Sequence, residues 1–390
     1  AHNPDNTSAE TNGTIVTISE SPIKPGLIWI GTDDGNVQIT KDDGVTWENL
    51  TDRLPAILPK ELWVSRVEAS HFDEATAYIS VEGHRSDEFR PYVFKTTDYG
   101  RTWADISANI PEDEPIYVIK EDLRNPNLLF AGTEFAAYAS LDGGGSWHNI
   151  NSNMPPVAVH DLLIHPRDND LIAGTHGRGI WIMDDITPLQ QLTEETMEKD
   201  AAALENRRVT RWLSLRKNIS YSEDMGHQLF KGRNPAVAGY INLYLKDVPA
   251  DTVRVYISDL QKEVTRYIPY KGKAGLNRIR WNFQGDPSDL NKKFFELLQS
   301  YFAEEDDKEK ENILENAVSD LEPYFESDRD KTNIEQYLDY IRQGFITQAP
   351  RSPQRPFAGP DNYFVRIVVD GKEYTSTLEI RRDPLLDESR

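Results

Sequence analysis

The stretch that decides the fold runs from Gly132 to Asn149 and reads GTEFAAYASLDGGGSWHN. Its second half has the pattern Ser-x-Asp-x-Gly-x-Ser-Trp, and the same pattern with Thr in place of Ser begins at Thr40 and at Thr96. The Asp and Trp positions of the three copies are Asp42, Trp47, Asp98, Trp103, Asp142 and Trp147. The aspartates lie 56 and 44 residues apart, a period typical of stacked β units such as propeller blades.

Each copy of the pattern has the chemistry of a tight turn. The hydroxyl and the carboxylate can accept hydrogen bonds from backbone N–H groups of the turn, and the glycine can adopt the positive φ that such turns need. The indole that opens the next strand can fill the apolar space between neighbouring sheets. We therefore predict a structural role for these residues. The pattern resembles the Asp-box, or BNR repeat, of sialidases, sortilins and related propellers.

Composition excludes several classes of protein. A chain of 390 residues is long enough for two or three domains. Its net charge of −22 argues against nucleic acid or an anionic membrane as a partner. The absence of cysteine excludes disulfides, a thiolate metal site and a cysteine nucleophile. No apolar run approaches the roughly 20 residues of a membrane helix. The first residues, AHNPDNTSAETNG, contain no signal-peptide core, and we interpret them as a cut end.

Residues 1–187 are predicted to form four β-propeller blades. Three of them contain an Asp-box, whereas the fourth reads Met183-Asp184-Asp185-Ile186 at that place and lacks the Gly and the Trp. Four blades are few, and a last blade without a regular outer strand needs a strand from elsewhere. We expect the blades to be part of a larger propeller, with the remaining blades upstream or on a partner chain. A closed ring of four blades is the alternative.

The second half of the chain is predicted to contain a connector and a further β domain. Residues 188–235 form the connector, in which Thr193 can cap a helix that extends to about Arg207. Residues 236–390 show alternating short strands and an Asp370-Gly371 turn, which favour an Ig-like β-sandwich. A helical insertion is expected at about 286–346 from its apolar periodicity. Residues 286–340 carry 17 acidic and 6 basic side chains, consistent with a solvated acidic helical surface.

Longer stretches resemble one family. They are EASHFD from Glu68, GHRSD from Gly83, PYVFKTTD from Pro91 and HDLLIHPRDNDLIAGTHGRGIWIMDD from His160. They are similar to secreted bacterial BNR proteins related to the sortilin (Vps10) propeller, which are often labelled glycosyl hydrolases. The similarity extends loosely to RWN at Arg280 and DNYFVRIVVDGKEY at Asp361, which resemble a FlgD-type Ig module. It implies a secreted, extracellular or cell-surface protein, on the bacterial outer surface or in the periplasm.

Polar side chains are expected to converge on the face opposite the Asp-boxes, where the turns between the second and third strands of each blade lie. The candidates for a ligand site are Asp33, Asp34, Arg66, His84, Arg85, Glu134, His160, Asp161, His176 and Arg178. Groups from several blades that meet at one mouth can form a polar binding site. The alternative is that they only bond to one another and stabilise loops.

The sequence does not contain a recognisable catalytic set. A sialidase arginine triad cannot be assembled, and HExxH, P-loop and GxSxG motifs are absent. No metal or cofactor is expected. The sequence therefore favours a binding or scaffolding module for a protein or glycan ligand. The alternative is a BNR-type glycoside hydrolase that uses two carboxylates, for which Asp33, Asp34, Glu134 and Asp161 are the candidates by position.

Overall fold

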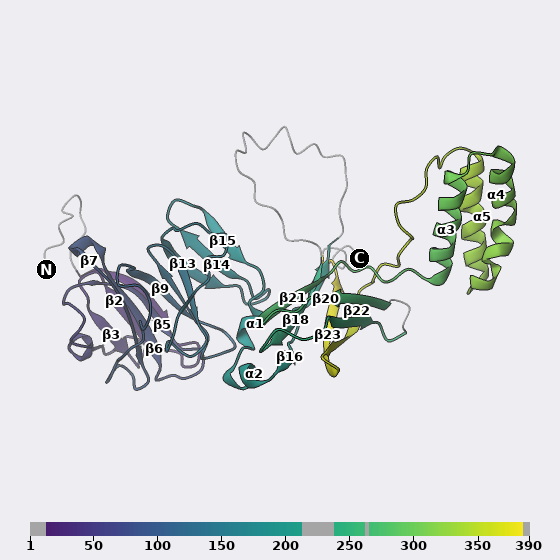
Figure 1. Ribbon diagram of the computed structural model, residues 1–390. Coiled ribbons are helices and arrows are strands. Elements are labelled where there is room, and N and C mark those ends of the chain that lie inside the picture. Colours follow the sequence, from purple (N-terminus) through teal and green to yellow (C-terminus); the bar gives the residue numbers. More distant parts are fainter. Residues whose placement is uncertain (1–12, 213–237, 262–264, 385–390) are drawn as a thin grey trace. The chain divides into compact units, whose positions relative to one another are not determined.

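The computed structural model describes residues 13–212, 238–261 and 265–384. The chain forms two compact units, Ala1–Glu198 and Lys199–Arg390 (Figure 1). The supposed cut end at residues 1–12 and the part of the connector at 213–235 lie outside the described residues. The domain boundaries inferred from the sequence remain predictions.

The first unit consists of four antiparallel sheets that follow one another along the chain. Blade one contains β1 (Ile15–Glu20), β2 (Ile28–Thr32), β3 (Val37–Thr40) and β4 (Glu48–Asn49). Blade two contains β5 (Trp63–Ala69), β6 (Ala77–Gly83), β7 (Glu88–Thr96) and β8 (Ala104–Asp105). Blade three contains β9 (Ile116–Glu121), β10 (Leu129–Thr133), β11 (Ala137–Ser140) and β12 (His148–Asn149). Blade four contains β13 (Val159–Ile164), β14 (Leu171–Thr175) and β15 (Ile180–Met183).

Hydrophobic side chains join each blade to the next one. One core cluster contains residues of blades one and two, such as Trp29 and Phe94. A second joins blades two and three, and a third joins blades three and four. Within the described residues, no core cluster joins blade four to blade one. The outward faces of these two blades instead present apolar side chains to solvent: Ile15, Ile18, Trp47, Leu163, Ile180 and Ile182.

The three Asp-box turns repeat the same hydrogen bonds. In blade three, Ser146 donates to Asp142 through both its backbone N–H (2.8 Å) and its hydroxyl (2.7 Å). The Ser140 hydroxyl donates to the same carboxylate (2.7 Å) and accepts from the N–H of Gly144 (2.8 Å). Equivalent bonds surround Asp42 and Asp98. Bonds from Thr102 hold the pKa of Asp98 at about 2. These bonds fix the hairpin that leads into the outer strand.

The second unit contains a β-sandwich. One sheet has the order β16-β18-β21, and the other has the order β17-β23-β22-β19-β20. The strands are β16 (Ala201–Ala203), β17 (Val209–Arg211), β18 (Gly239–Leu245), β19 (Val253–Ser258), β20 (Thr265–Tyr270), β21 (Gly275–Trp281), β22 (Asp361–Val369) and β23 (Lys372–Arg382). Side chains from both sheets share one core around Trp281, whose indole N–H donates to the carbonyl of Gln284 (2.9 Å). β17 pairs with β23 in parallel, so the larger sheet is mixed.

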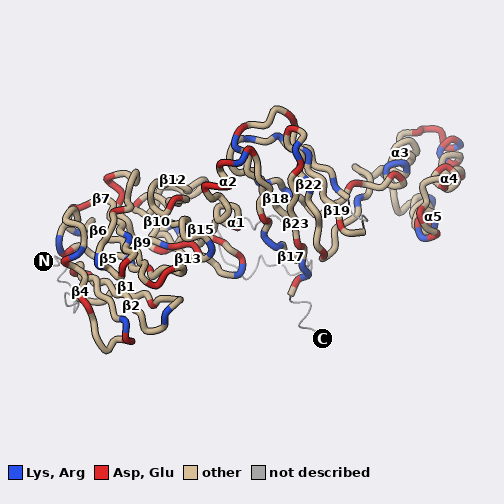
Figure 2. Tube along the Cα trace, turned by 90° about the horizontal axis from the view of Figure 1, so that it is seen from below, with Lys and Arg blue, Asp and Glu red and all other residues tan. Residues whose placement is uncertain are grey.

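Three amphipathic helices separate β21 from β22: α3 (Asp289–Ala303), α4 (Asp307–Leu321) and α5 (Asp328–Arg342). Their apolar stripes form a separate core that includes Leu298, Leu314 and Leu338. Asp and Glu positions recur along α4 (Figure 2). Propeller-like blades, a sandwich and a helical insertion together confirm the predicted fold class.

The connector differs from the helix expected between Thr193 and Arg207. After the short helix α1 (Thr187–Gln190), the helix α2 spans only Glu194–Glu198. The chain then forms β16, in which Ala201 pairs with Leu245. The prediction of a longer helix was wrong because backbone pairing with the sheet outweighs the helix preference of three alanines.

Candidate functional site

The candidate site lies at the end of the blades opposite the Asp-boxes. In each blade the first strand begins beside the end of the second, as the pairs Ile116–Thr133 and Val159–Thr175 show. The turn between the second and third strands lies at this same end, whereas the Asp-box follows the third strand at the other end. His84, Glu134 and His176 occupy these turns in blades two, three and four. The topology therefore places them at one end of the unit.

Four ring side chains from these three blades form a continuous row. The His84 ring meets Tyr117 edge to face at 5.9 Å between centroids. Tyr117 stacks on His160 at 4.3 Å, and His160 stacks on His176 at 5.2 Å. We call His84, Tyr117, His160 and His176 the ring row. It brings together three of the side chains predicted from the sequence, and it adds Tyr117, which was not predicted.

Two carboxylates border the ring row. The Tyr117 hydroxyl donates to Glu134 (2.5 Å), and Nδ1 of His84 pairs with Glu82. Burial, the hydrogen bond to Glu134 and the charges of Glu134 and Glu82 raise the pKa of Tyr117. Tyr117 therefore remains a neutral donor at physiological pH. Glu82 is the second site residue that the sequence did not identify.

The predicted arginines lie in different surroundings. Arg85 stacks over the ring of Trp63 at 4.4 Å, close enough for its charge to act on Tyr117. Arg66 forms an ion pair with Asp161 (2.5 Å), which links the first strands of blades two and four. Arg178 is exposed in the turn after β14, and its carbonyl accepts a bond from the indole of Trp181 (3.2 Å). Within the described residues, no ring contact or ion pair joins Arg178 to the row.

Asp33 and Asp34 serve the turn of blade one. Asp33 accepts bonds from the backbone N–H groups of Gly13 and Thr14, both at 2.8 Å. Asp34 accepts from the Thr32 hydroxyl (2.5 Å) and the Asn36 amide (2.8 Å). Burial acts to raise the pKa of Asp34, but these two hydrogen bonds lower it overall. The structure thus gives both aspartates turn contacts and does not join them to the ring row.

His160 lies in the middle of the exposed part of the ring row, between Tyr117 and His176. Both faces of His160 are covered by its neighbours, yet the side chain remains exposed. A neutral imidazole offers one donor and one acceptor at its edge. Burial and the proximity of His176 lower the pKa of His160, so the neutral form dominates at pH 7. Among the described residues, no group of three or more His, Cys, Asp or Glu is placed to hold a metal ion. The row is suited to hydrogen bonding with hydroxyl, amide or carboxylate groups.

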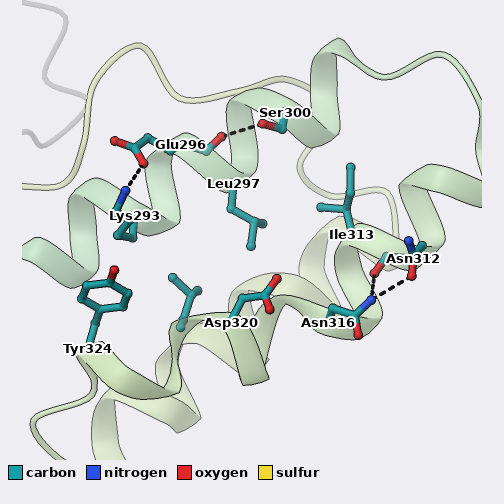
Figure 3. Close-up of a pocket in the computed structure, with 10 residues that line it drawn as sticks. Lys293, Glu296, Leu297, Ser300, Asn312, Ile313, Asn316, Asp320 and Tyr324 are labelled. Carbon is teal, nitrogen blue, oxygen red and sulfur yellow. Dashed lines mark hydrogen bonds and ion pairs between the residues drawn. The ribbon is translucent and has the colours of Figure 1, made fainter.

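Two pockets lie away from the ring row. One, of about 660 Å³, lies between the blade-one turn and the segment 51–62, and it has Leu54, Pro55 and Leu58 in its lining. The other, of about 440 Å³, lies between α3 and α4 (Figure 3). Its polar side chains bond to one another, as in the Lys293–Glu296 pair (2.7 Å). This second pocket is an opening between amphipathic helices, with no cluster of reactive groups.

The fold and the ring row define a protein with β-propeller-like blades and a polar face built from their turns and first strands. Several solved structures are similar. YCF48 bound to D1 peptide shares 17% identity, with 64% of this chain and 66% of that chain covered and a TM-score of 0.34. The GH74 enzyme of Niastella koreensis shares 15% identity over 46% of this chain and 24% of its own, with a TM-score of 0.34. The GH74 xyloglucanase of Xanthomonas campestris shares 11% identity over 68% and 38%, with a TM-score of 0.35.

These similarities concern the fold alone. All three TM-scores are far below 0.5, so the matches carry no argument about residue roles. This chain spans 66% or less of the length of each of the three proteins. No protein-family model matches the sequence, and the comparison with curated proteins gives no match. In the described part of the chain, no helix is long and apolar enough to cross a membrane.

Proposed function

We propose that this protein is a binding and scaffolding module that engages a protein or glycan ligand through the ring row. The observation that carries the proposal is the meeting of side chains from three separate blades at one end of the unit. His84 and Tyr117 are held by carboxylates, and Tyr117 is buried. The site is therefore preorganised, and a ligand need not order it on binding. The YCF48 structure holds a peptide, which makes peptides a reasonable first class of probe.

We further propose that the blades assemble with additional blades. The outward faces of blades one and four expose Ile18 (67%), Ile180 (72%) and Ile182 (57%). Clustered apolar side chains on a sheet face favour burial against a partner. The assembly is proposed to act outside the cell, at the bacterial surface or in the periplasm, as the sequence resemblance implies.

Ligand selection tests the binding proposal. The full chain is immobilised and screened against a random peptide library and against a glycan array. Affinities of the selected probes are then measured by calorimetry for the wild type and for His160→Ala, His176→Ala and His148→Ala. His148 is the matched control because it is exposed on β12, at the Asp-box end. We expect His160→Ala and His176→Ala to weaken the affinity about tenfold or more, which corresponds to roughly 1.4 kcal/mol, and His148→Ala to leave it unchanged. Failure to select any probe, or equal affinity in all variants, contradicts the proposal.

Glycoside hydrolysis is the second candidate, favoured by the pair of carboxylates on the ring row. Glu82 and Glu134 both act on Tyr117 and on His160, and glycosidases use two carboxyl groups that flank the scissile bond. Xyloglucan is the probe, because one of the proteins with a similar fold is a xyloglucanase. Release of reducing ends that is abolished by Glu134→Gln and Glu82→Gln, but retained in the exposed Glu112→Gln, would favour the hydrolase. We expect no release.

A further inference from the structure

The outer strands of blades one, two and three end in the same local arrangement. The third residue after each box tryptophan is Leu50, Ile106 or Ile150, and its backbone N–H donates to the third strand of its own blade (2.8 to 2.9 Å). Leu50 then packs against the box glycine of blade two, where a Cβ on Gly100 would lie 2.4 Å from it. Ile106 packs in the same way against Gly144 of blade three, at 2.7 Å. The outer strands of blades one and two thus end in an apolar side chain that contacts the Asp-box of the next blade. Blade four has no Asp-box, so Ile150 makes no such contact and packs against the cluster shared with blade four instead.

The box tryptophans show the same relation. Trp103 packs against Trp29 of blade one with ring centroids 6.2 Å apart. Trp147 is 2% exposed, and its indole N–H donates to the carbonyl of Ile106 in blade two (2.7 Å). Trp47 of blade one has the same box geometry but is 41% exposed. The nearest side-chain atom to a Cβ on Gly44 belongs to Trp47 itself, at 3.7 Å. The Asp-box of blade one is therefore formed but uncovered.

We infer that the outward face of blade one, formed by Ile18, Gly44 and Trp47, binds the outer strand of a further Asp-box blade. The partner's Leu or Ile, three residues after its own box tryptophan, would lie against Gly44 as Leu50 lies against Gly100. This inference rests on the proposed assembly with additional blades, and it names the face and the partner. The established interfaces of the chain support it, because the same contact is already made twice.

A second copy of this chain does not supply the required strand. Leu50 is completely buried by blade two, and Ile106 and Ile150 pack against the clusters shared with the following blades. In the described residues, blade four has three strands and no outer strand after β15. The partner is therefore a complete four-stranded blade whose end is not yet covered.

An added blade tests this inference. Residues 13–62 are duplicated in front of Gly13 in the full chain, so that a second Leu50 can reach Gly44. The chain has no cysteine, so Ile18→Cys provides one thiol whose reaction with a maleimide reports the exposure of this face. Ile180→Cys, on the exposed face of blade four, is the matched position. Leu50→Asp in the added copy removes the proposed contact, and Val45→Asp, at a position 81% exposed, is its control.

The added blade should slow the labelling of the Ile18→Cys thiol at least about tenfold, since protection from solvent reports local burial. Labelling of the Ile180→Cys variant should be unaffected, Leu50→Asp should restore the labelling at position 18, and Val45→Asp should not. Unchanged labelling at position 18 overturns the inference. This holds also if the added blade does not fold, because the outward face of blade one should provide the surface on which that blade folds. A different outcome is that replacement of Ile182 restores labelling at position 18 and that the protein sediments as a dimer. This would show that blade four of a second copy covers the face, and it would also overturn the inference. None of these results depends on the ring row, so they are distinct from a failure of ligand binding.

Discussion

Replacement of Asp142 by alanine tests the structural role of the Asp-box. The carboxylate accepts three hydrogen bonds, from the N–H and hydroxyl of Ser146 and from the hydroxyl of Ser140. A net bond of this kind contributes about 0.5–1.5 kcal/mol. Ser146 is close to solvent, so water can replace part of the loss. We expect Asp142→Ala to lower the free energy of unfolding by about 1–3 kcal/mol. Asp142→Asn keeps the Oδ1 acceptor of two of the bonds and should cost about half as much.

The measurement is urea unfolding followed by tryptophan fluorescence. The chain has two compact units, so two transitions can occur. Only the transition of Ala1–Glu198 should move, because Trp147 lies in its core. Asp113→Ala is the matched control, since Asp113 is an exposed aspartate between blades two and three; it should change stability by less than about 0.5 kcal/mol. An Asp142→Ala effect no larger than that of the control would refute the reasoning.

Three further perturbations test other parts of the structure. His160 has a lowered pKa because of burial and the nearby His176; its contribution to stability is complete above about pH 6.5 and falls as the pH drops. His160→Asn should reduce the fall of the melting temperature with decreasing pH in this range. A melting temperature that falls as steeply as in the wild type would contradict this prediction. Glu114→Ala removes the acceptor of the buried Tyr138 hydroxyl (2.9 Å) and the nearer of the two acceptors of the Thr133 hydroxyl (2.5 Å), and denaturation should show a loss of about 1–3 kcal/mol; a loss as small as that of a surface mutation would count against it. Trp281→Ala should cost about 3–5 kcal/mol in the sandwich transition alone, and a shift of both transitions would show coupled units.

The features of the fold that the sequence predicted are local ones. Each Asp-box is closed by bonds between residues two to four positions apart, so the pattern of eight residues is enough to identify the turn. The helical insertion follows from its own apolar period, and its three helices share a core of their own. The helix predicted to begin after Thr193 exists as α2, but its early end at Glu198 was not predictable in this way. Whether Ala201–Ala203 forms helix or strand depends on Leu243–Leu245, whose residues pair with them from 40 to 44 positions later in the chain, and no local pattern contains that partner.

The ring row depends on contacts between blades, and this explains which members were missed. The candidates were charged residues and histidines of the turns and of the strands that enter the channel, whereas Tyr117 lies within a strand and resembles a core residue. One signal was available. Tyr117 and His160 are both the second residue of the first strand of their blades, so an alignment of the repeats places a second ring at this position. Glu82 could have been found from His84, because it lies in the strand that leads directly into the turn containing His84.

The two ends of the blades have different physical tasks, and this difference explains how a site can form in so regular a fold. The Asp-box end is closed by short-range hydrogen bonds and by a packed tryptophan, partly buried in blade two and buried in blade three, so each hairpin is stabilised without help from the opposite end. The turns at that opposite end can then carry His84, Glu134 and His176 with little loss of stability, because packing does not decide their identity. Stacked blades bring equivalent turns together, so residues that are about 40 to 50 positions apart in the sequence become neighbours in space. A binding face can arise in this way while the blade interfaces stay as they are.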